Sequence, residues 1–180
     1  MKGIVFTEFL DMVEKEFGYE TVDFIIEESK LESNGIYTAV GTYPHSEIVA
    51  LLMNLSDKVQ VEPTKLLKAF GKYLFDTFLA SYPQFFNSVD NAFDFLHSID
   101  NHIHVEVLKL YPDATLPKFN SHVNEDGVMV MLYQSERKMA ALAEGLIEKS
   151  IAHYNEDCHM SIRNIKEDGS EVEFRIQRIG

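Results

Sequence analysis

The sequence has little cysteine and no long apolar run, and each shortage excludes a class of protein. Cys158 is the only cysteine in 180 residues, so the chain cannot close an internal disulfide. No second cysteine lies near Cys158 and His159 to complete a zinc site. No apolar run approaches the roughly 20 residues of a membrane-spanning helix, and the first residues lack the cleavage site of a signal peptide. We therefore expect a cytoplasmic protein without a membrane segment.

Positive charge is also scarce, since 16 Lys and Arg residues stand against 29 Asp and Glu residues, for a net charge of −13. Such a field repels phosphate backbones and anionic lipid, which excludes nucleic acid and membrane surfaces as expected partners. The acidic surface either keeps the protein in solution or complements a basic patch on another protein. The 46% share of hydrophobic residues is that of an ordinary folded domain.

Apolar residues recur at spacings of three and four over most of the chain, which predicts helices. The predicted helices cover 6–17, 47–55, 63–82, most of 89–111, and 137–154. Gly18 is placed to end the first helix, Ser46 to cap the second, and Pro63 to open the third.

Strand patterns appear only after Pro117. Residues 128–132 form a short apolar run, residues 160–165 alternate weakly, and residues 172–176 alternate strictly. The turn residues 167–170 predict that the last two strands form a hairpin. The fold class is therefore α+β, one domain over 1–180, with a helical part (1–60) and a part (61–180) whose helices pack on a small antiparallel sheet of about four strands.

Two histidines, His102 and His104, lie in the helical stretch 89–111 and are separated by about 200° around a helix, so only one can face inward. His104 shares its side with Val107, Leu108 and Tyr111, which indicates that His104 is the inward residue. A lone histidine on an apolar face is either a hydrogen-bonded core residue or a metal ligand; neutral imidazole is the usual axial ligand of haem iron.

A second cluster, Tyr133, Ser135 and Arg137, stands where a predicted strand passes into a helix. Alternation along an extended segment places the three side chains on one side. An arginine fork with two hydroxyls suits a carboxylate or a phosphate. The alternative is that Ser135 caps the helix, Tyr133 is core and Arg137 is a solvated charge.

These features together resemble the H-NOX family, the haem nitric oxide/oxygen binding domains related to the regulatory region of soluble guanylate cyclase. The resemblance extends over essentially the whole chain. It includes the MKG start, the helix with His104, Pro117 thirteen residues later, and the Y-x-S-x-R pattern at 133–137.

The resemblance implies that haem b (iron protoporphyrin IX) lies between the helical part and the part with the sheet. It implies that His104 is the iron ligand and that Tyr133, Ser135 and Arg137 hold the propionates. Pro117 would press on the porphyrin and bend it; without the family it would be read as a loop proline.

The resemblance also assigns the wall opposite the histidine. Oxygen-binding members carry a tyrosine there, and the matching position in this chain is Leu142. Phe9, Leu74 and Phe78 are further candidates for this wall, each equally consistent with plain core packing. The sequence therefore resembles that of a sensor that binds nitric oxide, and also carbon monoxide, but excludes oxygen.

The expected function is non-enzymatic signalling to a separate protein, such as a histidine kinase or a cyclic di-GMP synthase or phosphodiesterase. The switch that the family implies is the release of His104 from the iron. Two alternatives remain: an oxygen sensor, and a haem-free interaction module. An enzyme is not expected, because no nucleophile-elbow or phosphate-loop glycine pattern is present.

Overall fold

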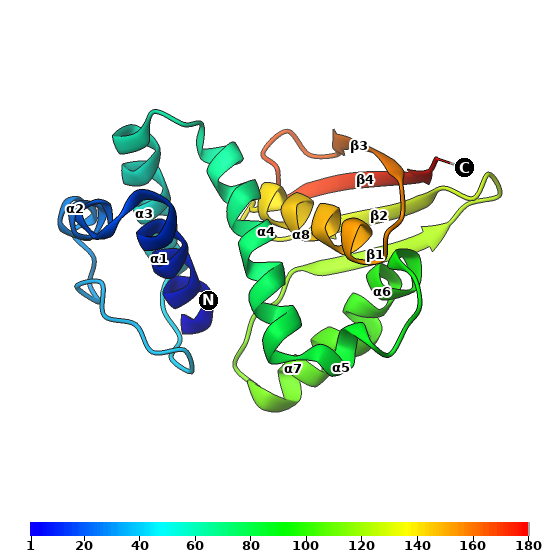
Figure 1. The fold of residues 1–180 in the computed structure, drawn as a ribbon, viewed down its shortest axis with the longest axis horizontal. Helices are drawn as coiled ribbons and strands as arrows, with labels where there is room; N and C mark the ends of the chain where they lie inside the picture. The colour runs from blue at the N-terminus through cyan, green and yellow to red at the C-terminus, as the bar shows by residue number, and fades with distance from the viewer. Residues whose placement is uncertain (180) are drawn as a thin grey trace.

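Helices form the first two thirds of the chain and one antiparallel sheet forms most of the last third, in a computed structural model that describes residues 1–179 (Figure 1). The first helices are α1 (Gly3–Phe17), α2 (Tyr19–Ser29), α3 (His45–Val59), α4 (Pro63–Ser81) and α5 (Pro83–Phe86). They are followed by α6 (Ala92–Ser98), a π-helical segment (Ile99–Ile103), α7 (His104–Leu110) and α8 (Ala140–His153). The strands are β1 (Lys118–Val123), β2 (Met129–Gln134), β3 (Cys158–Asn164) and β4 (Glu171–Arg178).

The first three helices gather on one side of the molecule, and α4 runs between them and the sheet (Figure 1). On α1 the expected apolar face is buried, with Phe6, Phe9 and Val13 all fully inaccessible. Gly18 ends α1 at a φ of 85°, a conformation that glycine adopts without strain, and α2 begins at the next residue. The predicted helices 6–17 and 63–82 are thus confirmed.

The expected cap of the second predicted helix is wrong. That helix, α3, begins at His45, so Ser46 lies inside its first turn and makes no capping bond. The preceding residue, Pro44, is extended, with φ −59° and ψ 133°. Proline fixes φ in a range that suits the residue before a helix, and the helix therefore starts directly after it.

The sheet has the order β1-β2-β4-β3, and each neighbouring pair is antiparallel. The β3–β4 hairpin was predicted from the turn residues 167–170 and is confirmed. The strand that the sequence did not locate is β1, an edge strand in which Phe119 and Ser121 are the only half-buried residues. One face of the sheet packs against α8, and Met131, Phe174 and Ile176 are fully buried there.

The two parts of the fold meet along α4. Its crossing with α8 is close because Gly71 and Gly145 face each other across it: a Cβ on Gly145 would collide with the carbonyl oxygen of Lys68. Lys68 also forms ion pairs with Glu144 and Glu148 of α8, at 2.6 Å each.

The side chains of α4 belong to two cores. Leu66, Leu67 and Phe70 belong to the core of the helical part, whereas Phe75 belongs to the core under the sheet. The boundary between the two parts of the domain, expected between residues 60 and 61, stays a prediction.

Over residues 1–179, no helix combines the length and the apolar character that crossing a membrane requires.

Candidate functional site

A cavity of about 300 Å³ lies between α1, α4, α7, α8 and the start of the sheet, and apolar side chains form most of its wall. This volume is at the lower end of the range for small-molecule sites. Segments that are distant in sequence meet there, including the first residues of the chain, the end of β2 and the loop between α7 and β1. The cavity is lined by eight of the nine residues singled out from the sequence, namely Leu74, Phe78, His104, Pro117, Tyr133, Ser135, Arg137 and Leu142.

Phe9 is the ninth, and it lies outside the cavity lining. Its side chain is fully buried in the core of the helical part, where its ring meets the edge of Phe70 at a centroid distance of 5.2 Å. From α1, the residues that reach the cavity are instead Ile4 and Val5, together with Met1 and Lys2 before the helix.

His104 is the first residue of α7, and its imidazole faces the cavity with 17% of the side chain exposed. Its Nδ1 atom lies 3.1 Å from a carboxylate oxygen of Asp100. An ionised carboxylate only accepts, so Nδ1 carries the proton and Nε2 keeps a free lone pair. Burial lowers the pKa of His104, and the negative charge of Asp100 opposes this shift only in part. The ring is therefore neutral at pH 7 and held in the tautomer that a metal ligand needs.

A π-helical segment, 99–103, precedes His104 directly. The backbone N–H of His104 donates to the carbonyl of Ile99, five residues earlier. Single π turns inside helices are frequent at functional sites. Here His104, Val107 and Tyr111 line the cavity, whereas Leu108 is 41% exposed. The expectation that Leu108 shares the inward face with His104 is therefore wrong.

The three residues of the second cluster line the cavity, and their hydrogen-bond donors are not all used within the protein. The hydroxyl of Tyr133 accepts the backbone N–H of Met139 at 3.0 Å, and the hydroxyl of Ser135 accepts that of Arg137 at 3.2 Å. Over residues 1–179 neither hydroxyl donates to a protein acceptor, so both O–H groups can serve another molecule.

Arg137 supplies the charge of this cluster. Its guanidinium is half-buried, and burial lowers its pKa. Within the described part of the chain it pairs with no carboxylate, although the chain holds 29 acidic residues. A desolvated cation next to two free hydroxyl donors is suited to bind an anion, and a carboxylate matches the guanidinium fork.

The wall on α8 is apolar along the cavity. Leu142, Ala143, Leu146 and Ile147 line it, and the one hydroxyl there, Ser150, donates to the carbonyl of Leu146 at 2.8 Å. The family resemblance implies Leu142 on this wall, whereas the contribution of Ser150 could not be expected, since only the fold reveals which residues of α8 face α4.

Two tyrosines, Tyr82 and Tyr111, also reach the cavity and were not singled out from the sequence. Tyr111 follows α7 directly, so it comes from the same wall as His104. Burial raises the pKa of Tyr82, and the neighbouring Tyr111 raises it further. The ammonium of Lys2 lies 5.1 Å from the ring centroid of Tyr111.

Comparison with known proteins gives consistent results. A model of the haem-NO-binding family matches residues 2–162. Among solved structures, the Fe(II) unliganded H-NOX protein from K. algicida is 44% identical, with a TM-score of 0.95, over 100% of this chain and 97% of that one. The Shewanella woodyi H-NOX in the Fe(II)CO ligation state is 41% identical, with a TM-score of 0.84, over 99% of this chain and 95% of that one. An H-NOX protein from S. oneidensis in the Fe(II)NO ligation state shares the fold at 24% identity, with a TM-score of 0.92 and full coverage of both chains. No curated protein matches the sequence.

Proposed function

This chain belongs to the haem-NO-binding (H-NOX) family of haem-binding gas-sensor domains, and on that premise we propose that it is a nitric oxide sensor that excludes oxygen and signals to a separate protein. One observation carries the proposal. A neutral, oriented histidine and three unused donors share one apolar cavity, whose α8 wall offers no free hydroxyl.

The donor set fits haem b. His104 would hold the iron through Nε2, because Asp100 already engages Nδ1. Tyr133, Ser135 and Arg137 would hold the two propionates with their free hydrogens. Pro117 lines the same cavity and would press on the porphyrin edge or face. When bound, the group would supply a ferrous iron that can bind a diatomic gas.

Selectivity would follow from the side chains that α4 and α8 contribute to the cavity wall. Bound oxygen is polar, and the hydrogen-bond donors of a distal pocket decide whether it is held. The side chains of Leu142, Leu74 and Phe78 have no polar hydrogen, and the hydroxyl of Ser150 already donates to the carbonyl of Leu146. Nitric oxide and carbon monoxide bind ferrous haem without such help, so this wall favours them over oxygen.

An oxygen sensor is the second candidate, because Tyr82 and Tyr111 bring hydroxyls to the cavity. Against it, Tyr111 directly follows α7, the helix that begins with His104. Neither tyrosine lies on α8, where oxygen-binding members of the family are expected to carry their donor.

The receiver in this proposal is a separate protein, and the chain itself is not an enzyme. A histidine kinase or a cyclic di-GMP synthase or phosphodiesterase is the class of partner that the family suggests. The net charge of −13 supports contact with a basic surface, since complementary potentials steer association and fix specificity.

The test is the visible absorption spectrum of the reduced protein in air and then with nitric oxide, beside His104→Gly. We expect a Soret band that is unchanged by oxygen, is shifted by nitric oxide, and is lost in the variant unless imidazole is added. His102→Gly is the matched control, because His102 is exposed and lies on the same stretch of helix. A stable oxygen spectrum would favour the second candidate, and the absence of a Soret band after reconstitution would leave a haem-free interaction module.

A further inference from the structure

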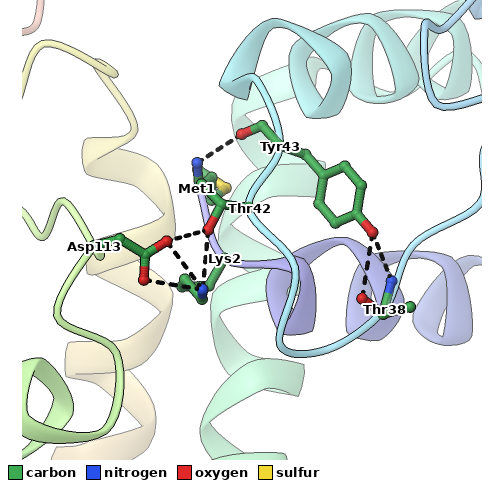
Figure 2. A network of polar contacts seen from close by, with 6 residues as sticks. All are labelled: Met1, Lys2, Thr38, Thr42, Tyr43 and Asp113. Carbon is green, nitrogen blue, oxygen red and sulfur yellow. Dashed lines mark hydrogen bonds and ion pairs between the residues drawn. The ribbon is translucent and has the colours of Figure 1, made fainter.

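A polar cluster fastens the first residues of the chain to the segment between His104 and Pro117. The ammonium of Lys2 lies 3.3 Å from each carboxylate oxygen of Asp113 and donates to the hydroxyl of Thr42 at 2.9 Å. The hydroxyl of Thr42 in turn donates to Asp113 at 2.6 Å (Figure 2). We call Lys2, Thr42 and Asp113 the strap.

The strap is anchored firmly on the side of the helical part. The terminal ammonium donates to the carbonyl of Tyr43 at 2.7 Å (Figure 2). Lys2 and Thr42 also face each other in an antiparallel bridge, and the N–H of Tyr43 donates to the carbonyl of Met1 at 2.9 Å. The side chain of Lys2 is only 12% exposed. These bonds fix residues 1–3 and 41–43 as one unit at the start of α1.

On its other side the strap holds a single short segment. Asp113 lies nine residues after His104 and four before Pro117. The ammonium of Lys2 also lies over the ring of Tyr111, the residue that directly follows α7. The hydroxyl of Thr42 and then the ammonium of Lys2 lower the pKa of Asp113, so its carboxylate stays ionised across the neutral range.

The strap is also isolated. In the part of the chain that the structure describes, all hydrogen bonds and ion pairs between residues 1–60 and residues 82–179 belong to Lys2, Thr42 and Asp113. The remaining links between these two regions run through α4 or through apolar contact, which is non-directional.

We propose that the strap transmits displacement of α7 to the helical part of the molecule, so that it couples the position of His104 to the orientation of α1–α3. This inference rests on the proposed function, since it assumes that α7 moves when a gas binds. Coupling between distant elements can be carried by hydrogen-bond and ion-pair networks that connect them. The strap is such a network, because it joins the residues next to the start of α1 to the segment after α7 by directional bonds.

The test is hydrogen–deuterium exchange of the haem-loaded protein, reduced, with and without nitric oxide. The readout is the backbone amides of 39–43, whose N–H groups and carbonyls bond residues 1–4. In the wild type we expect nitric oxide to change their exchange rate by about threefold, at the low end of measured couplings. In Asp113→Asn this response should disappear while the Soret shift remains. Thr42→Val provides a second, nearly isosteric variant in case Asp113→Asn fails to fold.

Lys109→Met is the matched control. It removes a lysine that pairs with Glu106 at 2.6 Å within α7 but does not reach the helical part. It should respond as the wild type does.

The outcomes separate this inference from the proposed function. If nitric oxide did not shift the Soret band of the wild type, the proposed function as a nitric oxide sensor would be refuted. A normal Soret shift with an equal exchange response in wild type and Asp113→Asn, or with no response at 39–43 in either, would refute the strap alone.

Discussion

Replacing Arg137 by methionine should weaken haem binding through the carboxylates, and the expected size can be worked out from the site. A charge-assisted hydrogen bond contributes roughly 1.5–3 kcal/mol. The guanidinium is half-buried and has no other carboxylate within residues 1–179, so its interaction with a propionate is neither shared nor fully screened. A loss of about 2 kcal/mol corresponds to about a 30-fold weaker affinity.

The assay is a competition titration of haem against a scavenging apoprotein, followed at the Soret band. It should be repeated with the dimethyl ester of the same porphyrin, which has no carboxylate charge. Esterification should weaken binding to the wild type far more than binding to Arg137→Met, because the variant has already lost the cation that recognises the charge. Arg163→Met serves as the control, since Arg163 is 69% exposed and pairs with Glu173 on the sheet. If Arg137→Met weakened the acid and the ester equally, the assignment of Arg137 to the carboxylates would be wrong.

Four further predictions concern the rest of the site and its frame. Burial lowers the pKa of His104 below its ordinary value of 6.5, so that, as the pH falls, the unfolded chain binds a proton on this imidazole before the folded chain does. The free energy of unfolding of the haem-free protein should therefore keep its full value above pH 6.5 and decrease as the pH falls below it. Asp100→Asn should lower the pKa further, since the opposing charge is gone, and imidazole titration by NMR would contradict this if the pKa rose or stayed constant. Leu142→Tyr should give a lasting oxygen spectrum in air, and an unchanged spectrum would mean that position 142 does not face the gas. Gly145→Ala should force α8 away from the carbonyl of Lys68 and lower the free energy of unfolding by about 1–3 kcal/mol, hence Tm by about 2–12 °C; an unchanged melting curve would show that the crossing can relax.

The long helices and the buried strands could be predicted because their signals are local. The apolar spacing of α1 and α4, and the strict alternation in β4, are properties of neighbouring residues, and each is matched by a buried face. The strand β1 lacked such a signal because it lies at the edge of the sheet and buries little. The start of α8 was also misplaced: the helix begins at Ala140, after Lys138 adopts a left-handed φ of 56°.

The cluster of donors was anticipated for a reason that is only partly correct. Alternation along one extended strand was expected to align Tyr133, Ser135 and Arg137, but β2 ends at Gln134. The three side chains meet because a turn follows the strand, in which the hydroxyls of Tyr133 and Ser135 accept the N–H groups of Met139 and Arg137. Those same bonds leave the hydroxyl hydrogens free, a property that no sequence pattern could reveal.

Contacts between distant residues lay beyond the reach of a single sequence. Phe9 and Phe78 look alike as apolar helix positions, and only the packing separates a core residue from a cavity residue. The strap joins residues that are 111 positions apart, and nothing in the local sequence around Lys2 or Asp113 marks them as partners. Asp100 could have been found, since it precedes His104 by one helical turn, although the π segment changes the expected phase.

The charge of the whole chain and the charge of the cavity act in opposite directions, and distance decides between them. A porphyrin with two carboxylates is repelled by a net charge of −13, but most of those charges are solvent-exposed and are screened beyond roughly 10 Å at 0.1 M salt. Arg137 is close and partly desolvated, so its attraction is screened much less. The acidic surface is therefore not needed for the cofactor, and nitric oxide, being neutral, is indifferent to it; a basic partner protein is the molecule that it would attract.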